Sequence, residues 1–161
     1  MRRILLVDDE VNVLNALVRA LRQLPGSEEM DIETYTDPFD ALTRCADCTF
    51  DLVISDFRMP QMTGVEFLHA IKAVSPDTVR IILSASTEFS TVTSAINDAE
   101  VFRFIAKPWQ IGDLRENIRL AFAHRDALRA QHGGGKEAAG KEADESELMK
   151  VKWGPNGEII L

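Results

Sequence analysis

The chain has 161 residues, of which 45% are hydrophobic and 27% are charged, and its formal net charge is −8. This length suits one domain with a sizeable core. The negative charge argues against direct binding to nucleic acids or anionic membranes, because both attract basic surfaces. No apolar run approaches the ~20 residues of a membrane-spanning helix, and Asp8 interrupts the first apolar run too early for a signal peptide. The two cysteines make no disulfide framework, so we expect a cytoplasmic protein.

The first half of the chain alternates between strand and helix patterns. Ile4 to Val7 is continuously apolar, and apolar residues then recur at helical spacing until Pro25 and Gly26 end the pattern. Asp37 is a predicted N-cap, since Pro38 occupies the first helical position after it. The predicted elements are a strand over residues 2–7, a helix over 10–24, a weaker edge-type strand over 30–36 and a helix from 37 to about 46.

The second half repeats this alternation, beginning with a short strand that is predicted to be fully buried. Leu52 to Ile54 is an apolar run that leads to the carboxylate of Asp56, and Pro60 prevents easy continuation. Thr63 and Glu66 have the spacing of a capping box, which predicts the start of a helix. The remaining predicted elements are a helix from 63 to about 74, strands over 79–83 and 101–105, and helices over 88–98 and from about 111 to 131.

Repeated strand–helix pairs with short connections predict an α/β domain. Parallel strands joined by right-handed crossovers place helices on both faces of the sheet, which is the doubly wound arrangement. In such sheets the functional site lies at the carboxyl ends of the strands. We therefore expect the functional side chains among the residues that end or follow each strand.

The composition changes after Gln131. Residues 132–147 are rich in glycine, alanine and glutamate, which is typical of a flexible linker. Residues 148–161 alternate again around a turn signal at Gly154–Gly157, which predicts a short β-hairpin. An isolated hairpin is marginal in water, so it would have to pack on the domain, a second subunit or a partner. The expected organisation is a domain over 1–131, a linker over 132–147 and a tail over 148–161.

Polar and charged side chains follow four of the predicted strands. They are Asp8 and Asp9 after the first, Asp56 after the third, Ser84 after the fourth and Lys107 after the fifth. Carboxylates that meet at one sheet edge repel one another, by about 4 kcal/mol per pair at ~4 Å and an effective dielectric of about 20. A proton or a cation must neutralise them, and oxygen ligands with room for water suit Mg²⁺. A divalent cation, a lysine and a hydroxyl around one carboxylate describe a site that binds a phosphoryl group, with the carboxylate as nucleophile.

The motifs at these strand ends form a recognisable set. In chain order they are Asp8-Asp9-Glu10, Asp56 with Met59-Pro60 and Gly64, Ser84-Ala85, and Lys107-Pro108. On these motifs, the chain from about Arg2 to about Arg129 resembles the receiver domain of two-component response regulators. The resemblance implies a flavodoxin-like (βα)5 fold with a five-stranded parallel sheet in the order 2-1-3-4-5.

The resemblance further implies that Asp56 is a phosphoacceptor. It would take a phosphoryl group from a sensor histidine kinase or a phosphotransfer protein. Asp9, Asp56 and the main-chain carbonyl of Arg58 would bind Mg²⁺ directly, and Asp8 would bind it through water. The domain would catalyse only its own phosphoryl transfer and dephosphorylation, so we expect a signalling domain and not an enzyme.

The resemblance also assigns the parts of a conformational switch. Lys107 would contact the phosphoryl group, and Lys107–Pro108 would carry a cis peptide bond. Ser84 would move to hydrogen-bond the phosphoryl group, and Phe104 occupies the position of the aromatic switch. The surface of the fourth helix, fifth strand and fifth helix would then change its affinity for a downstream partner or output module.

The sequence leaves two alternatives for what such a domain controls. One is a stand-alone receiver whose tail docks locally, and the other is the amino-terminal receiver of a larger regulator with a cyclic-dinucleotide or kinase output. No helix-turn-helix pattern is present, so direct DNA binding is not expected. A phosphatase of the haloacid-dehalogenase type would need an aspartate where Arg58 stands. A flavin-binding module would not place Asp8-Asp9-Glu10 in its phosphate-binding loop, since these acids repel phosphate.

Two other features have an ordinary structural interpretation. One side of the last helix carries an apolar stripe of Leu114, Ile118, Ala121, Phe122 and Leu128, which indicates core packing. The end of this helix is also a candidate homodimer seam, although Arg125 interrupts the heptad pattern. Cys45 and Cys48 have a metal-like spacing but no second pair, whereas a structural metal needs four ligands.

Overall fold

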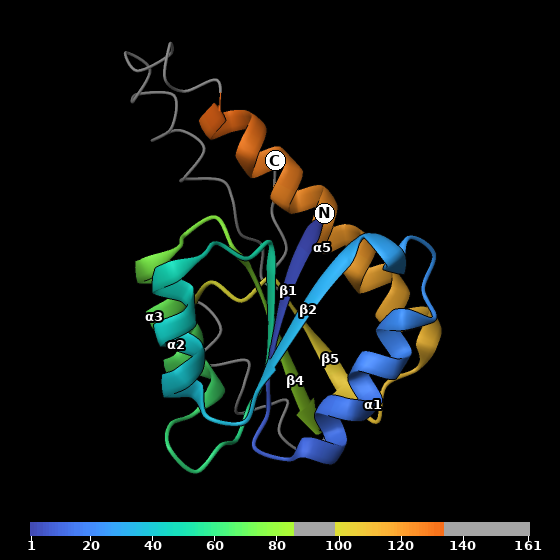
Figure 1. Cartoon of the computed structure of the whole chain (residues 1–161), viewed down its shortest axis with the longest axis vertical. Coiled ribbons are helices and arrows are strands. Elements are labelled where there is room, and N and C mark those ends of the chain that lie inside the picture. Colours follow the sequence, from blue (N-terminus) through green and yellow to red (C-terminus); the bar gives the residue numbers. More distant parts are fainter. Residues whose placement is uncertain (86–98, 134–161) are drawn as a thin grey trace.

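The computed structural model describes residues 1–85 and 99–133, and Figure 1 shows its elements. Strands and helices alternate as the sequence predicts. The elements are β1 (Arg2–Val7), α1 (Val11–Arg22), the 3-10 turn η1 (Ser27–Glu29), β2 (Met30–Tyr35), α2 (Pro38–Asp47), β3 (Leu52–Asp56), α3 (Gly64–Val74), β4 (Val79–Ala85), β5 (Arg103–Lys107) and α5 (Ile111–Gly133). The predicted helix over 88–98, most of the predicted linker over 132–147 and the predicted hairpin lie outside the described residues; residues 132 and 133 of that linker belong to α5.

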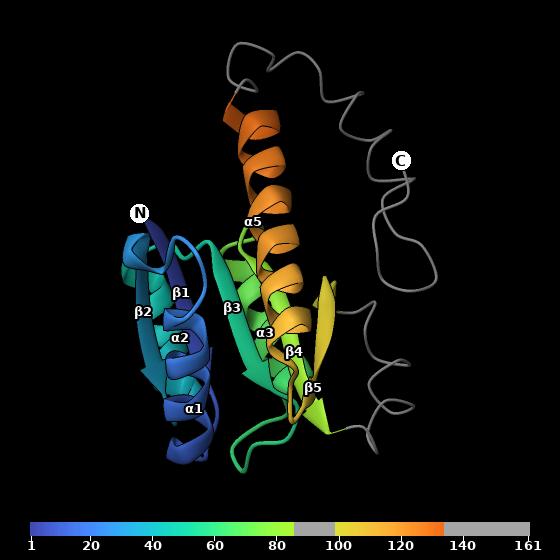
Figure 2. The same cartoon turned by 90° about the vertical axis from the view of Figure 1, so that its right-hand side faces the viewer.

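The strands form one parallel sheet in the order β2-β1-β3-β4-β5. Helices α1 and α5 cover one face of this sheet, and α2 and α3 cover the other (Figures 1 and 2). The predicted doubly wound, flavodoxin-like fold and its strand order are confirmed. The weaker strand, β2, lies at an edge, and the fully buried β3 lies in the centre.

A hydrophobic core lies on each face of the sheet, because alternate strand residues point to opposite faces. On β1, Ile4 and Leu6 join the core beneath α1 and α5, and Leu5 and Val7 join the core beneath α2 and α3. Burial on both faces explains the continuous apolar runs of the central strands. Trp109, which follows the cis proline, packs against the core beneath α1 and α5.

The fifth strand begins at Arg103 and not at residue 101, where the sequence predicts it. The apolar residues 101 and 102 are buried, and the Phe102 N–H donates to the Arg80 carbonyl of β4 at 2.7 Å, but the residue pairing with β4 begins only at Arg103. The chain is still turning just before them, since Glu100 has a φ of 50°. The apolar pattern therefore predicts the burial of residues 101 and 102 correctly but places the start of the strand two residues too early. Lys107 is therefore the last residue of β5, whereas the sequence predicts that it follows the strand.

The start of α3 lies very close to the end of β3. The Thr63 side chain accepts from the N–H of Glu66, and the Glu66 side chain accepts from the N–H of Thr63, so the predicted capping box is confirmed. This cap places Gly64 against the strand end, where its N–H donates to the Phe57 carbonyl at 2.7 Å. A Cβ at Gly64 would collide with the backbone oxygen of Asp56.

Replacing Gly64 with alanine is expected to lower the free energy of unfolding by about 3 kcal/mol, the upper part of the range for overpacking. The new Cβ would meet a backbone oxygen, which cannot rotate away as a side chain can. Gly112→Ala is the matched control, because a Cβ there meets nothing within 4 Å and alanine favours a helix by about 0.5–1 kcal/mol. Urea unfolding of both variants measures the difference. Equal stability of the two would show that the end of β3 yields to the added methyl group.

Helix α5 runs to Gly133, past its predicted end at Gln131, and it extends beyond the end of the sheet (Figure 2). In the part of the chain that the structure describes, no helix is both long enough and apolar enough to cross a membrane.

Candidate functional site

Three strands deliver charged side chains to one end of the sheet. Asp8 follows β1, Asp56 is the last residue of β3, and Lys107 is the last residue of β5. The Lys107 Nζ atom lies 2.8 Å from Asp56 Oδ1 and 3.6 Å from Asp8 Oδ2. The peptide bond from Lys107 to Pro108 is cis, as predicted. The strand order therefore brings together residues that are far apart in the sequence.

The carboxylates of Asp8, Asp9 and Asp56 form an acidic cluster. Each contributes an oxygen, and these oxygens lie within 4.8 Å of one another. Asp8 and Asp56 are 2% and 6% exposed, whereas Asp9 is exposed. Lys107 supplies one positive charge against three negative ones. The excess of negative charge and the all-oxygen donor set mean that this cluster can hold a metal ion.

Asp8 uses one carboxylate oxygen and leaves the other without a hydrogen bond. Its Oδ1 accepts from the backbone N–H of Glu10 at 2.8 Å, the pattern of an Asx-turn. Its Oδ2 is buried, and no hydrogen bond from residues 1–85 or 99–133 reaches it. Buried carboxylate oxygens usually have a partner. This unsatisfied oxygen fits a hard divalent cation or a water molecule bound to one.

Burial shifts the protonation of these groups. It raises the pKa of Asp8 to about 6, against the opposing effect of the Glu10 N–H and with a further increase from the charge of Asp56. Burial also raises the pKa of Asp56, although the hydrogen bond from Lys107 acts in the other direction. For Lys107, burial acts to lower the pKa, but the hydrogen bond and the charges of Asp56 and Asp8 outweigh it and raise the pKa. Lys107 is therefore charged at neutral pH.

The predicted switch residues lie on the strands β4 and β5. Ser84 is completely buried, and its hydroxyl donates to the Ala85 carbonyl at 3.0 Å. In the sheet register Asp56 stands opposite Leu83, so Ser84 lies one residue further along the neighbouring strand. Phe104 is half-buried and packs against the core beneath α2 and α3. Ser84 is thus next to the strand end that carries Asp56, and Phe104 is deeper in the sheet.

The other residues considered from the sequence lie outside the charged cluster. Arg58 is exposed, and its guanidinium carbon lies 5.4 Å from the centre of the Phe57 ring. Cys45 is buried in the core beneath α2 and α3, where burial raises the pKa of its thiol to about 11. Cys48 is half-buried. Among the described residues, the acidic cluster is the group that meets metal-ligand geometry, and neither cysteine belongs to it.

Two contributions to the site were not predicted from the sequence. The Glu10 N–H orients Asp8, and the missing Cβ of Gly64 lets α3 begin against Asp56. The first has a local signal, because an aspartate commonly bonds the N–H two residues later before a helix. The second depends on a contact between segments, which the sequence alone does not display.

A comparison with known families identifies the domain. A family model described as the response regulator receiver domain matches residues 4–119. The hydrogenase transcriptional regulatory protein HoxA of Bradyrhizobium diazoefficiens is 29% identical over 151 residues, which are 94% of this chain and 30% of that protein. This chain therefore spans less than a third of the length of that relative.

Solved structures share the same fold. The signal receiver domain of an HD domain-containing protein from Pseudomonas fluorescens Pf-5 is 33% identical, with a TM-score of 0.73 over 80% of this chain and 92% of that one. The receiver domain of a beryllofluoride-activated NtrC4 dimer is 28% identical, with a TM-score of 0.69 over 78% of this chain and 99% of that one. The family match covers most of the chain and includes the acidic cluster and Lys107. The chain belongs to the response regulator receiver domain family.

Proposed function

We propose that this domain accepts a phosphoryl group on Asp56 from the phosphohistidine of a histidine kinase or a phosphotransfer protein. A carboxylate oxygen of Asp56 attacks the phosphorus, the phosphorus–nitrogen bond breaks, and the imidazole leaves and takes a proton from solvent. The product is an acyl phosphate. The observation that carries this proposal is the ammonium group of Lys107 at 2.8 Å from Asp56, where it can neutralise a phosphoryl oxygen.

Mg²⁺ is the cation that best fits the acidic cluster. Asp9, Asp56 and the main-chain carbonyl of Arg58 would hold it directly, and Asp8 would hold it through water. When bound, Mg²⁺ supplies positive charge that offsets the carboxylates and the phosphoryl oxygens. The chain's own residues orient Asp56 and supply Lys107 as the second source of positive charge.

Mg²⁺ is expected to stabilise the fold more strongly at about pH 7.5 than at about pH 5, and at ~100 times its Kd it would add about 2.7 kcal/mol. The difference arises because the pKa of Asp8 is raised to about 6, so a proton competes with the cation in the more acidic buffer. Thermal unfolding with and without MgCl2 in the two buffers measures the stabilisation by Mg²⁺ at each pH.

Without Mg²⁺, the pH dependence of folding stability from Asp8 has the opposite sign. Burial of Asp8 raises its pKa from 3.8 to about 6, so its contribution favours the folded state at low pH and is lost as the pH rises through this window. Asp9→Asn should remove the effect of Mg²⁺, whereas Asp40→Asn, in the first turn of α2, should keep it. An equal Mg²⁺ effect at both pH values, or its persistence in Asp9→Asn, would contradict the assignment of this site.

Acetyl phosphate tests the proposed chemistry without a partner kinase. With Mg²⁺ present, the full chain should gain one phosphoryl group as the phosphorus–oxygen bond of the donor breaks and acetate leaves. Hydroxylamine should remove this group, because it attacks acyl phosphates, and EDTA should prevent its formation. A modification that resists hydroxylamine, or no modification at all, would contradict the proposal.

The same assay separates this function from an aspartate-nucleophile phosphatase. Such an enzyme would release phosphate continuously from phosphomonoesters, with an acid/base carboxylate close to its nucleophile. Here the residue two positions after Asp56 is Arg58, which is exposed and cationic. We therefore expect one phosphorylation event per chain, followed by slow hydrolysis of the acyl phosphate.

Phosphorylation would shift the domain between two conformations. It adds about −1.5 to −2 units of charge and three acceptor oxygens at Asp56. The Ser84 hydroxyl, which donates to the Ala85 carbonyl, would turn toward a phosphoryl oxygen. Phe104, which is half-buried on β5, would turn further inward. Both changes would alter the surface around β5 and α5, and the shift is one of population between two states.

The printed names of the relatives describe regulators with different outputs. HoxA is a transcriptional regulatory protein, and the Pseudomonas fluorescens receiver belongs to an HD domain-containing protein. We propose that this domain likewise controls an output module or a separate partner protein, and that homodimers are one of its states, because the NtrC4 receiver forms a dimer. Light scattering of the full chain with and without beryllofluoride measures that state.

A further inference from the structure

The part of α5 nearest its carboxyl end contacts the sheet through ion pairs. Earlier in the helix, the residues that face the sheet are apolar, and Leu114, Ile118 and Ala121 are buried in the core. The next position in this stripe is Arg125, which is only 6% exposed. The stripe changes from apolar to cationic where α5 reaches the amino-terminal end of the strands, opposite to the end that carries Asp56.

Arg125 pairs with Asp51, the residue that precedes β3. The Arg125 Nε atom lies 3.0 Å from Asp51 Oδ1, and both side chains are about nine-tenths buried. The same guanidinium donates through Nη1 to the carbonyl of Asp77 at 2.9 Å. One turn further along α5, Arg129 places its Nη1 atom 3.8 Å from the same Asp51 oxygen. Two arginines of one helix face therefore converge on one buried carboxylate.

Asp51 is itself held by the backbone of the sheet. Its Oδ2 accepts from the N–H of Arg3 at 2.8 Å, and its own N–H donates to the Arg3 carbonyl at 2.8 Å. Its carbonyl accepts from the N–H of Val79, the first residue of β4, at 3.1 Å. Asp51 is thus tied to β1 and β4 as well as to β3. An anchor held in this way cannot follow an arginine that moves.

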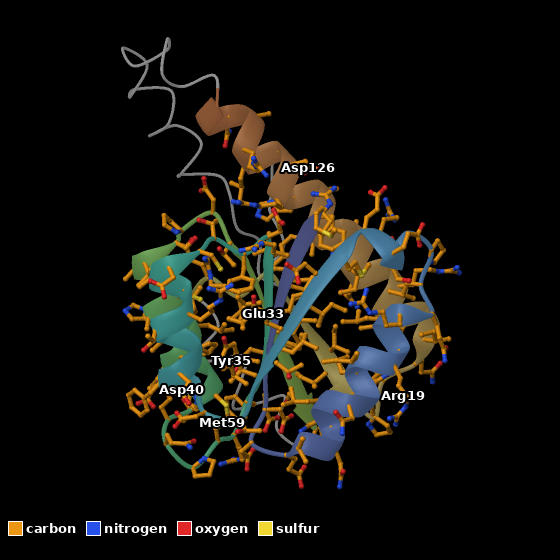
Figure 3. The ribbon with its side chains drawn as sticks, in the orientation of Figure 1. Arg19, Glu33, Tyr35, Asp40, Met59 and Asp126 are labelled. Carbon is orange, nitrogen blue, oxygen red and sulfur yellow. The ribbon has the colours of Figure 1, made fainter. Side chains whose placement is uncertain are left out.

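A second ion pair fixes the same turn of α5. Arg2 donates through Nη1 and Nη2 to the two carboxylate oxygens of Asp126, at 2.7 and 2.9 Å, and its guanidinium carbon lies 4.6 Å from the centre of the Phe122 ring. Figure 3 shows Asp126 near one end of the sheet and Met59, from the loop after β3, near the other. This pair is more exposed than Arg125–Asp51, so it contributes less.

We propose that Arg125 is a positioning residue that fixes the direction in which α5 leaves the domain, with Asp51 as its anchor. Apolar contacts tolerate sliding and rotation, whereas a guanidinium that bridges a carboxylate and a carbonyl accepts few orientations. The carboxyl end of α5 would therefore hold a defined position relative to the sheet. This inference does not rest on phosphorylation, because Asp51 and Asp56 lie at opposite ends of β3.

Spin labels on the full chain test this proposal. Cysteines at Gln23 and Ala130, both exposed, carry the labels after Cys45→Ala and Cys48→Ser remove the native thiols. Pulsed EPR should give a narrow distance distribution when Arg125 is present, and a broader, shifted one in Arg125→Met and in Asp51→Asn. Labelling of Asp56 by acetyl phosphate should be unchanged in these variants, which a general loss of folding would not allow.

Two further variants keep the test decisive. Arg119→Met is the matched control, because Arg119 lies on the same helix and pairs with Glu116 at the surface, and it should leave the distribution narrow. Arg125→Lys keeps the charge but cannot bond both Asp51 and the Asp77 carbonyl, so it should broaden the distribution less than methionine does. A distribution that stays narrow in Arg125→Met, or in Arg125→Lys if only that variant folds, would overturn the proposal.

Discussion

Replacing Asp56 with asparagine is expected to abolish phosphorylation by acetyl phosphate. The amide is nearly the same size as the carboxylate, but its oxygen carries no negative charge and is a poor nucleophile. Burial raises the pKa of Asp56, so the fold favours the neutral form and should tolerate the amide. Intact-protein mass spectrometry after incubation with acetyl phosphate and Mg²⁺ should show only unmodified chain.

Asp51→Asn is the matched control for this experiment. It makes the same chemical change at the other end of the same strand and should leave phosphorylation intact, while it affects α5 as described above. Full phosphorylation of Asp56→Asn would show that another carboxylate is the phosphoacceptor. Asp8 and Asp9 would be the first candidates, because they belong to the same acidic cluster.

Replacing Lys107 with methionine is expected to slow phosphorylation by roughly 100- to 1,000-fold, the usual effect of removing one preorganised charge-stabilising donor. Methionine keeps most of the aliphatic stem, so the main loss is the ammonium group that lies 2.8 Å from Asp56. The negative charge that develops on the phosphoryl oxygens would then lack its protein counter-charge. The rate of incorporation from acetyl phosphate at saturating Mg²⁺ measures this loss.

Lys72→Met provides the control for Lys107→Met. Lys72 is a partly exposed lysine that also pairs with a carboxylate, Glu100 at 3.1 Å, but it lies outside the acidic cluster. Its loss should leave the phosphorylation rate unchanged. A rate for Lys107→Met close to that of Lys72→Met would show that Mg²⁺ alone neutralises the phosphoryl group.

The sequence predicted the fold well because its strongest signals are local. Continuous apolar runs marked β1, β3 and β4, and the capping box at Thr63 marked the start of α3. Parallel strands end at the same edge of the sheet, so the sequence also predicts that Asp8, Asp56 and Lys107 lie close together, as they do. The weak alternation of β2 also indicated an edge strand, which is where it lies.

The sequence failed where contacts between segments decide the structure. Residues 101 and 102 have strand composition and are buried, but the residue pairing with β4 begins only at Arg103. In the sequence, Arg125 interrupts the apolar stripe of α5 and weakens its heptad pattern. The structure shows that it is buried against Asp51, a residue 74 positions away in the chain. Periodicity predicts which face of a helix is buried, but it does not reveal that a charged residue on that face is buried in an ion pair.

The arrangement of α5 also restricts which surface a proposed homodimer could use. The stripe from Leu114 to Ala121 is buried within the domain, and Arg125 extends the intramolecular contact by a further turn. A dimer that used this stripe would have to displace the sheet. We therefore expect any dimer to use another face of α5 or the segment after Gly133, and Arg125→Met should leave the oligomeric state of the phosphorylated chain unchanged.

Borohydride trapping tests the central claim most directly. Borohydride reduces an aspartyl phosphate to homoserine, so it records which carboxylate carried the phosphoryl group. After treatment of the full chain with acetyl phosphate and Mg²⁺, peptide mass spectrometry should find homoserine at position 56 and aspartate at positions 8 and 9. Homoserine at position 8 or 9, or none in a chain that has gained a phosphoryl group, would contradict the assignment of Asp56 as the phosphoacceptor.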